Sequence, residues 1–397
     1  MWKTAPGSTG RLLQLCLAYF SLYVLNGVFA KVFTGGSPFH MPEMAYLFNN
    51  TLGGSAIALF VVFALGWIRL KSNRLVKWGP FTVPSEVAYI IPSGICTAVV
   101  IPTTTLMYTL PISVMVAMVI MRGSIIVISR IIDAVQIRQG ILKKRVYAEE
   151  NWAVVFALLA VATNVVLLPL VSYLEGHGIH AAHWIGLKPG GAKGSFDFLH
   201  SPQAMTIMGL YIGSYSIRIY IMNFFKNTRG KGVPLDNQGF FAVEQISASL
   251  TMALIVAFFF FASPRLGWVS QPLADFRGAV RHPDLGAFLS GLPYGALSFF
   301  SVFIFMFKGR TATFAGLVNR LTSLLAGTMA TLLMFFIFKA KFPTVQDWLS
   351  VCFILVAVYF LGRAETLRIA EMSRESIGGA QPAPMAAAPA PAGGTGR

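Results

Sequence analysis

Stretches of about 20 apolar residues recur along the whole length of this 397-residue chain. A helix of that length crosses the roughly 30 Å hydrocarbon core of a bilayer. Hydrophobic residues make up 55% of the chain and charged residues only 12%, whereas a soluble domain is usually about one quarter charged. Lipid offers the backbone no hydrogen-bond partners, and the sequence lacks the alternating segments of a membrane barrel. The sequence therefore predicts an all-α membrane protein.

Ten runs are long enough to be transmembrane helices. They lie at residues 11–33, 44–68, 85–107, 110–132, 151–173, 204–225, 240–262, 286–307, 311–338 and 345–363. We expect residues 1–10 to form a short N-terminal segment and residues 174–203 to form an external loop. Residues 364–397 are rich in Ala, Pro and Gly, and we expect them to be a largely disordered tail.

The formal net charge of +16 is distributed unevenly about these spans. With the N-terminus inside, 20 of the 31 Lys and Arg residues fall in inside segments and 8 in outside loops. This positive-inside bias places both termini in the cytoplasm. The basic excess then reflects topology and attraction to anionic lipid head groups, and no nucleic-acid partner is predicted. A cell inner membrane is the preferred location, with a eukaryotic endomembrane as the alternative.

The second half of the chain repeats features of the first half in the same order. The matched positions are Asn26 with Asn223, Asn49-Asn50 with Glu244-Gln245, Pro92 with Pro293, Arg122 with Arg320, and Trp152 with Trp348, at separations of 195 to 201 residues. These pairs predict one five-helix repeat at 11–173 and a second at 204–363. Because five is odd, the repeats cross the membrane in opposite senses. Inverted repeats are typical of carriers, which bind substrate near the midplane between the halves.

Three stretches resemble the drug/metabolite transporter superfamily, whose members have five plus five helices. Residues 106–131 (LMYTLPISVMVAMVIMRGSIIVISRI) are similar to its fourth-helix region, and residues 347–365 (DWLSVCFILVAVYFLGRAE) are similar to its last helix. Residues 316–328 (GLVNRLTSLLAGT) resemble the Gly-Ala-Leu-Asn-Lys motif of the nucleotide-sugar transporters, with Arg320 in place of the lysine. The closest branches are the nucleotide-sugar transporters and chloroquine-resistance-transporter-like proteins. The resemblance implies a ten-helix carrier.

The chain departs from this family in the seventh span. Some nucleotide-sugar carriers read the base there with an aromatic-Asn-Asn motif, but this chain has Val243-Glu244-Gln245. Its own Phe48-Asn49-Asn50 stands in the second span instead. The difference argues against a guanine-nucleotide sugar as the substrate.

Three arginines lie within the predicted spans: Arg122, Arg218 and Arg320. An arginine at a helix centre costs about 2.5–3.5 kcal/mol to insert, so each must face protein or water. A guanidinium binds carboxylate or phosphate through two parallel hydrogen bonds. We therefore predict that all three bind an anionic substrate. The alternative is pairing within the bundle, which for Arg218 would involve Glu244.

Three acidic residues lie within or beside the spans. Glu244 is the candidate for proton coupling, because carboxylates inside membrane proteins often relay protons. Glu86 stands at the start of its span, where we expect a solvated helix end. Asp133 lies one turn from Arg130, and we expect the two to form an interfacial pair.

Other polar residues in the spans need partners in a dry interior. We predict that Asn26, Asn50, Asn223 and Asn319 contribute to the substrate site, with interhelical hydrogen bonding as the alternative. Pro92 and Pro293 remove backbone donors, and we expect them to kink gating helices.

These observations favour a carrier that moves a small polar solute, with an anion preferred, by alternating access. The alternatives are a proton-coupled exporter of metabolites or drugs that uses Glu244, an integral-membrane enzyme, and a non-transporting scaffold. No HExxH motif, DDxxD-type cluster or nucleophile–base pair accompanies the spans. We therefore predict no enzymatic activity, no catalytic residue, no cofactor and no metal. The expected partners are the substrate and membrane lipid, with the protein acting as a monomer or homodimer.

Overall fold

The computed structural model describes residues 7–34, 40–109, 114–143, 146–178, 202–230, 232–339 and 345–378. Most of these residues are helical. The helices are α1 (Thr9–Thr34), α2 (Glu43–Ala64), α3 (Val87–Thr109), α4 (Val114–Arg138), α5 (Ala148–Gly176), α7 (Pro202–Asn227), α8 (Asn237–Arg265), α9 (Gln271–Arg281), α10 (Leu285–Ser290), α11 (Leu292–Phe305), α12 (Ala312–Phe338) and α13 (Val345–Gly378). Two short antiparallel strands, β1 (Leu75–Trp78) and β2 (Phe81–Pro84), form a hairpin between α2 and α3.

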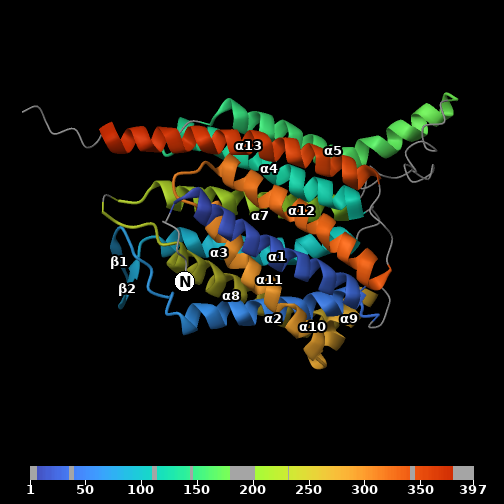
Figure 1. The fold of residues 1–397 in the computed structure, drawn as a ribbon. Helices are drawn as coiled ribbons and strands as arrows, with labels where there is room; N and C mark the ends of the chain where they lie inside the picture. The colour runs from blue at the N-terminus through green and yellow to red at the C-terminus, as the bar shows by residue number, and fades with distance from the viewer. Residues whose placement is uncertain are drawn as a thin grey trace, which may run out of the picture.

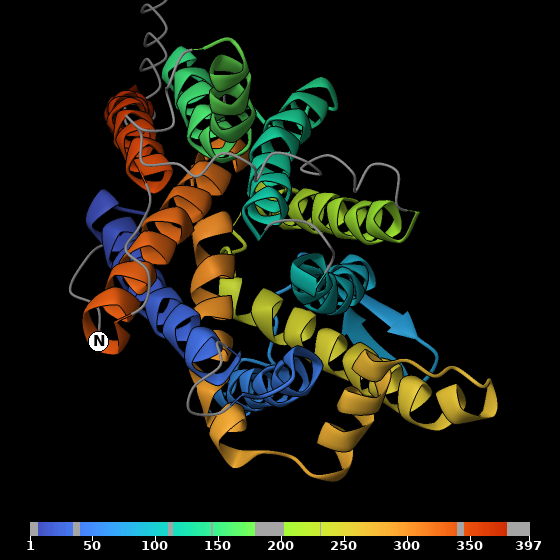
Figure 2. The same cartoon turned by 90° about the vertical axis from the view of Figure 1, so that its right-hand side faces the viewer.

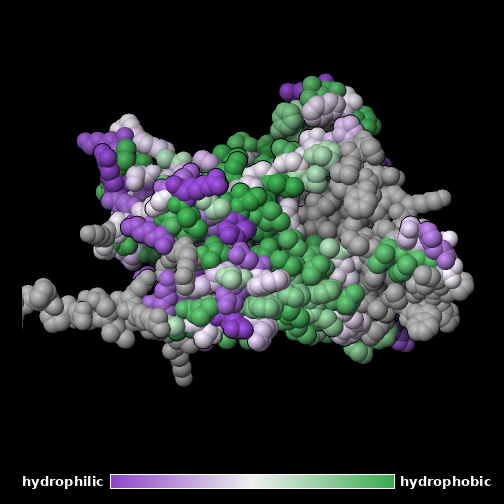
Figure 3. All heavy atoms as spheres, turned by 90° about the horizontal axis from the view of Figure 1, so that it is seen from above, coloured by the Kyte–Doolittle hydropathy of each residue, from purple (hydrophilic) through white to green (hydrophobic). Residues whose placement is uncertain are grey.

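Seven helical segments in the described part are long and apolar enough to cross a membrane. They are α1, α2, the first part of α3, α8, α10 together with α11, α12, and most of α13. Large apolar side chains stay exposed along them, such as Phe60 and Leu254. Figure 3 shows hydrophobic residues across the middle of one face, with hydrophilic residues concentrated toward one end. This surface suits contact with lipid and indicates an integral membrane protein.

The long helices form one bundle, and its two ends differ (Figures 1 and 2). One end, which we call the hairpin end, carries the start of α1, the β1–β2 hairpin and the last turns of α13 (Figure 1). There, Thr9 Oγ1 donates a hydrogen bond of 2.9 Å to Glu365 Oε1. The other end, which we call the α9 end, carries α9 and α10. The two described ends of the chain therefore lie on the same side of the bundle.

The α2 and α11 helices touch through glycine. A Cβ atom built on Gly295 would lie 2.0 Å from the carbonyl oxygen of Gly54, and one on Gly291 would lie 2.0 Å from that of Asn50. No side chain larger than hydrogen fits at such distances. Small residues allow membrane helices to approach closely, and here they bring together backbones from the two halves of the chain.

The fold departs from the sequence predictions at four places. The hairpin at 75–84 was not predicted, nor was the helix α9 in the expected loop after residue 262. The span expected at 286–307 is divided into α10 and α11, with Pro293 in the first turn of α11, where a missing N–H breaks no helical hydrogen bond. The tail expected from residue 364 is helical as far as Gly378. Residues 379–397, and most of the expected loop at 174–203, lie outside the described residues.

Candidate functional site

A cavity of about 160 Å³ lies inside the bundle, between helices from both halves of the chain. Its walls come from α1, α2, α3, α7, α8, α11 and α12. The lining residues are Tyr19, Gly54, Ser55, Thr97, Val100, Ile101, Thr104, Tyr211, Tyr215, Arg218, Phe241, Glu244, Gln245, Tyr294, Gly295, Leu297, Ser298, Ser301 and Arg320. Nine of these side chains carry hydroxyl groups, so the cavity offers many hydrogen-bonding groups to a polar solute.

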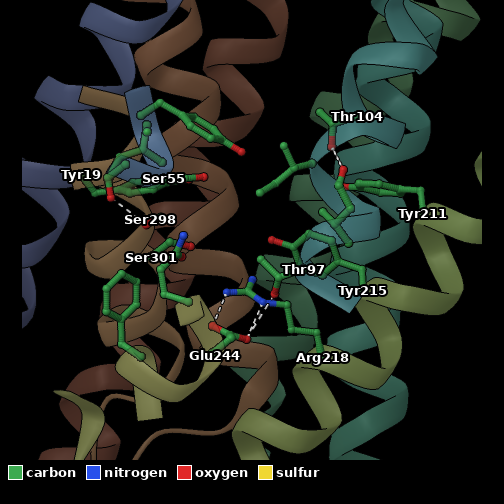
Figure 4. A pocket seen from close by; sticks show the side chains of 18 of the residues that line it. Tyr19, Ser55, Thr97, Thr104, Tyr211, Tyr215, Arg218, Glu244, Ser298 and Ser301 are labelled. Atoms are coloured by element: carbon green, nitrogen blue, oxygen red, sulfur yellow. Dashed lines mark hydrogen bonds and ion pairs between the residues drawn. The ribbon is translucent and has the colours of Figure 1, made fainter. Parts of the chain in front are cut away.

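Two walls face each other across this cavity in Figure 4. Tyr19, Ser55 and Ser298 lie on one side, while Tyr211 and Thr104 lie on the other. Arg218 and Glu244 meet below them (Figure 4). The polar groups thus converge on one space from helices far apart in sequence.

Arg218 on α7 and Glu244 on α8 form a bidentate ion pair. The Nε atom of Arg218 lies 2.9 Å from Oε1 of Glu244, and its Nη2 atom lies 3.0 Å from Oε2. The same carboxylate accepts hydrogen bonds from Ser93 (2.6 Å) and Thr97 (3.3 Å) on α3. Both charges are buried and balanced, which ties α3, α7 and α8 together. The pairing considered as the alternative for Arg218 is the one observed.

Arg320 on α12 presents a different situation. Its side chain is buried at 8% exposure, yet among the described residues neither Nε nor Nη2 has a hydrogen-bond acceptor within reach. Its guanidinium lies over the ring of Tyr215, with 4.9 Å between Cζ and the ring centroid. A cation over an aromatic face is stabilised, but two buried charged donors remain to be satisfied. Arg320 therefore adds to the cavity wall a cation with two donors that have no partner in the described part of the chain.

The two donors of Arg320 have a counterpart in the same cavity. Arg218 uses the same two atoms, Nε and Nη2, to hold the carboxylate of Glu244. The two arginines also share one ring, since Cζ of Arg218 lies 5.8 Å from the centroid of Tyr215. The Arg218 edge is thus occupied by a carboxylate, while the same two atoms of Arg320 have no acceptor among the described residues.

Arg122 on α4 is buried but does not line the cavity. Its guanidinium packs on α12, where a Cβ atom added to Gly327 would lie 3.8 Å from Nη2. No ion pair of Arg122 is found within the described part of the chain. Gly327 stands seven positions after Arg320, so Arg122 lies about two turns further along α12.

The four predicted asparagines are spread through the bundle, and none lines the cavity. Asn319 donates to Ser301, a lining residue, at 2.9 Å, while its own Oδ1 and that of Asn26 are buried without a partner in the described residues. Asn50 donates to Tyr46 (3.1 Å) and Ser290 (3.3 Å) toward the α9 end.

The remaining predicted residues lie away from the lining too. Asn223 donates to Gln136 at 2.7 Å near the hairpin end. Pro92 lies inside α3 and does not contribute to the cavity wall.

A layer of buried ionic contacts lies at the hairpin end. Arg310, in the turn before α12, pairs with Glu365 of α13 through two hydrogen bonds, one of 2.7 Å. Arg368 of α13 lies 3.1 Å from Glu150 of α5. Glu150 in turn accepts a hydrogen bond of 2.7 Å from Thr311. These contacts join α5, α12 and α13, and we call them the ionic layer.

Asp133 on α4 belongs to the same region. It accepts hydrogen bonds from the backbone N–H groups of Ala312 (2.8 Å) and Thr313 (2.6 Å), and so caps the first turn of α12. The expected pair with Arg130 is wrong, because Arg130 donates instead to Asn151 at 2.9 Å. A buried carboxylate is stabilised more by hydrogen bonds from the free N–H groups at a helix start than by an ion pair with a neighbour on its own helix.

Glu86 is not the solvated helix end that we expected. It is 1% exposed and lies 2.8 Å from Arg229 in the link between α7 and α8. Burial raises the pKa of its carboxyl. Hydrogen bonds from Ser72, Asn73 and Ser85 outweigh that effect and hold the pKa below its usual range.

The tyrosines of the cavity were not among the predicted site residues. They are contributed by α1, α7 and α11: Tyr19, Tyr211, Tyr215 and Tyr294. The sequence did not single them out because a tyrosine within an apolar run is usually interpreted as a packing residue. A usable signal was the spacing of Tyr211, Tyr215 and Arg218, which puts all three on one face of a helix. The fold and site together define a helical membrane protein with a buried, hydroxyl-lined cationic cavity.

Comparisons with known proteins add little to this description. No family model matches the chain, and no curated protein matches it. Among 11 matching solved chains, one is described as "Crystal structure of protein". It is 15% identical, with a TM-score of 0.45, over 89% of this chain and 98% of that one. A structural likeness at that level carries no functional information.

Proposed function

We propose that this protein is a carrier that moves a small polar anion across a membrane by alternating access. In this proposal the fold is the ten-helix inverted repeat of the drug/metabolite transporter superfamily. The helices α1–α5 correspond to α7, α8, the α10–α11 pair, α12 and α13. The solute binds in the cavity, and its anionic group is held by Arg320.

One observation carries the proposal. The buried Arg320 lines a hydroxyl-lined cavity between the two halves, and its Nε and Nη2 atoms have no hydrogen-bond partner among the described residues. A carboxylate or phosphate bound by these two atoms would satisfy both donors with the geometry that Arg218 already makes with Glu244. Transport would need only that the site positions the solute and neutralises its charge, so no reactive group is required.

The pattern of helix packing supports the inverted repeat. The α1 helix packs against α11 and α12, and its proposed counterpart α7 packs against α3 and α4. In the same way α2 packs against α11, and α8 packs against α3. The close approach of Gly295 to Gly54 has a counterpart in Gly94, where an added Cβ would lie 2.6 Å from the carbonyl oxygen of Glu244. Each of these helices thus packs against the equivalents of the helices that its counterpart contacts, as expected for two related halves.

The ionic layer supports alternating access. A carrier must close one side of its site while the other side is accessible. The ion pairs Arg310–Glu365 and Arg368–Glu150 lie at the hairpin end. In our proposal they form the closure on that side, because polar contacts can exchange with water more readily than an apolar core. In our proposal this end opens when those contacts separate.

The proton-coupled alternative has less support from the contacts. Both carboxylate oxygens of Glu244 are bonded to Arg218, and Ser93 and Thr97 bond to it as well. Glu244 is therefore engaged in holding three helices together, and we assign it a structural role in the cavity wall.

The test is uptake into proteoliposomes that contain the purified protein, with a panel of carboxylates, phosphate esters and neutral analogues of equal size. We expect anions to be taken up and Arg320→Gln to weaken their transport by about ten- to a hundredfold, since a charge-assisted contact contributes roughly 1.5–3 kcal/mol. Arg320→Lys should recover part of the activity, because it keeps the charge without the fork. Arg281→Gln, on the exposed surface of α9, is the matched control.

Two results would refute the proposal. One is full anion uptake by Arg320→Gln in a folded protein. The other is a panel in which no anion is taken up above empty vesicles. Recovery of a chemically altered solute would favour the enzyme alternative, and saturable binding without uptake would favour the scaffold.

A further inference from the structure

The β1–β2 hairpin has one entirely apolar face. In the register of the hairpin, Val76 pairs with Val83 and Trp78 pairs with Phe81. Side chains of paired residues lie on the same face, and faces alternate along a strand. These four residues therefore share one side. Trp78 is 47% exposed and Phe81 is 70% exposed, and none of the four belongs to the hydrophobic clusters of the described helices.

The base of the hairpin is held rigidly. Ser72 and Asn73, just before β1, bond to Glu86 at 2.5 Å and 2.6 Å. Asn73 also bonds to the carbonyl of Thr228 at 3.0 Å and accepts from the N–H of Gly230 at 2.9 Å. The hairpin is thus fixed to the link between α7 and α8, while its apolar face meets no core.

The charged residues within the hairpin segment itself are all basic. Arg69, Lys71, Arg74 and Lys77 fall within nine positions, and residues 65–85 include no Asp or Glu. All four residues are exposed. The hairpin therefore combines aromatic side chains with a basic cluster, and this combination complements a surface of anionic head groups over an apolar layer.

We propose that the hairpin is a membrane anchor whose apolar face enters the head-group region of the bilayer, where the basic cluster binds anionic lipid. The hairpin joins α2 directly to α3, two of the apolar spans, so it stands where the lipid boundary must begin. Seen along the bundle in Figure 2, it projects sideways from α3. This inference depends on the membrane setting of the chain and not on what the cavity carries.

The test compares two adjacent positions on opposite faces of the hairpin. Single cysteines are placed by Phe81→Cys and Thr82→Cys in a chain whose three native cysteines have been replaced, and each is labelled with an environment-sensitive fluorophore. The protein is reconstituted in phosphatidylcholine vesicles with and without phosphatidylglycerol, and quenching by nitroxide-labelled lipid and by aqueous iodide is measured. Position 82 is the matched control, because it shares the backbone but faces the other way.

We expect the label at position 81 to be quenched several-fold more by lipid than the label at position 82, with the reverse order for iodide. Phosphatidylglycerol should increase the lipid quenching, added salt should reduce that increase, and Arg74→Gln with Lys77→Gln should abolish it. Equal, solvent-like behaviour at both positions would overturn the proposal. Disulfide crosslinking between Phe81→Cys copies, lost on dilution in lipid, would overturn it in favour of a second copy of the chain.

Discussion

Replacing Glu244 with Gln should destabilise the protein because it leaves Arg218 buried without a counter-charge. Gln keeps an acceptor for Ser93, so the substitution isolates the loss of charge. Removing one partner of a buried ion pair costs about 3–5 kcal/mol. With an unfolding entropy of about 2.1 cal/mol/K per residue, a chain of 397 residues should then melt about 4–6 °C lower.

The assay is thermal unfolding of the purified protein in detergent, arranged as a double-mutant cycle. We expect Arg218→Gln and Glu244→Gln each to lower the melting temperature, and the double variant to lose much less than the two single losses combined. Asp275→Asn is the control, since Asp275 accepts its 2.8 Å hydrogen bond from Gln271 on exposed α9. A Glu244→Gln protein as stable as the wild type, or strictly additive losses in the double variant, would refute the coupling inferred from the geometry.

Two further predictions concern packing and pH. Gly295→Ala should prevent stable folding, because the added Cβ would lie 2.0 Å from the carbonyl oxygen of Gly54. Gly213→Ala on α7 should be tolerated, because a Cβ there would have no atom within 4 Å. Expression and gel-filtration profiles of the two variants test both expectations. Glu86 has a folded-state pKa below its unfolded value, so its contribution to stability is present above the unfolded pKa of about 4.3 and is lost as the pH falls through the folded pKa. The wild type should therefore lose more thermal stability than Glu86→Gln on acidification below about pH 4.3, and identical acid profiles would contradict the assignment.

Apolar runs predicted the helices well because the membrane imposes one simple rule on every span. Each expected span overlaps a described helix, or the α10–α11 pair in the case of 286–307. The sequence did not predict the hairpin, because four-residue strands between charged residues give only a weak alternation of polar and apolar residues. The helical extent of α13 was underestimated, since it is held beyond residue 363 by contacts of Glu365 and Arg368 with distant helices.

The site was harder to predict, for a related reason. Arg320 and the Arg218–Glu244 pair could be singled out, because a charge inside an apolar run demands an explanation. Contacts between helices decide which of these charged side chains has a partner. A local sequence pattern does not reveal those contacts. Asp133 shows the limit most clearly, since its partners are the N–H groups of a helix 179 residues further along the chain.

The capping of α12 by Asp133 also has a thermodynamic consequence. The same helix that starts at this cap carries Arg320 eight residues later, a rise of about 12 Å. In the proposed carrier, a movement that separates α4 from the start of α12 would break the hydrogen bonds to Asp133, and it would shift Arg320 if α12 moves as one rigid helix. If an anion binds Arg320, its affinity differs between the two states, and by reciprocity the bound anion shifts the equilibrium between them by the same factor. Opening and binding would then be linked through one rigid helix.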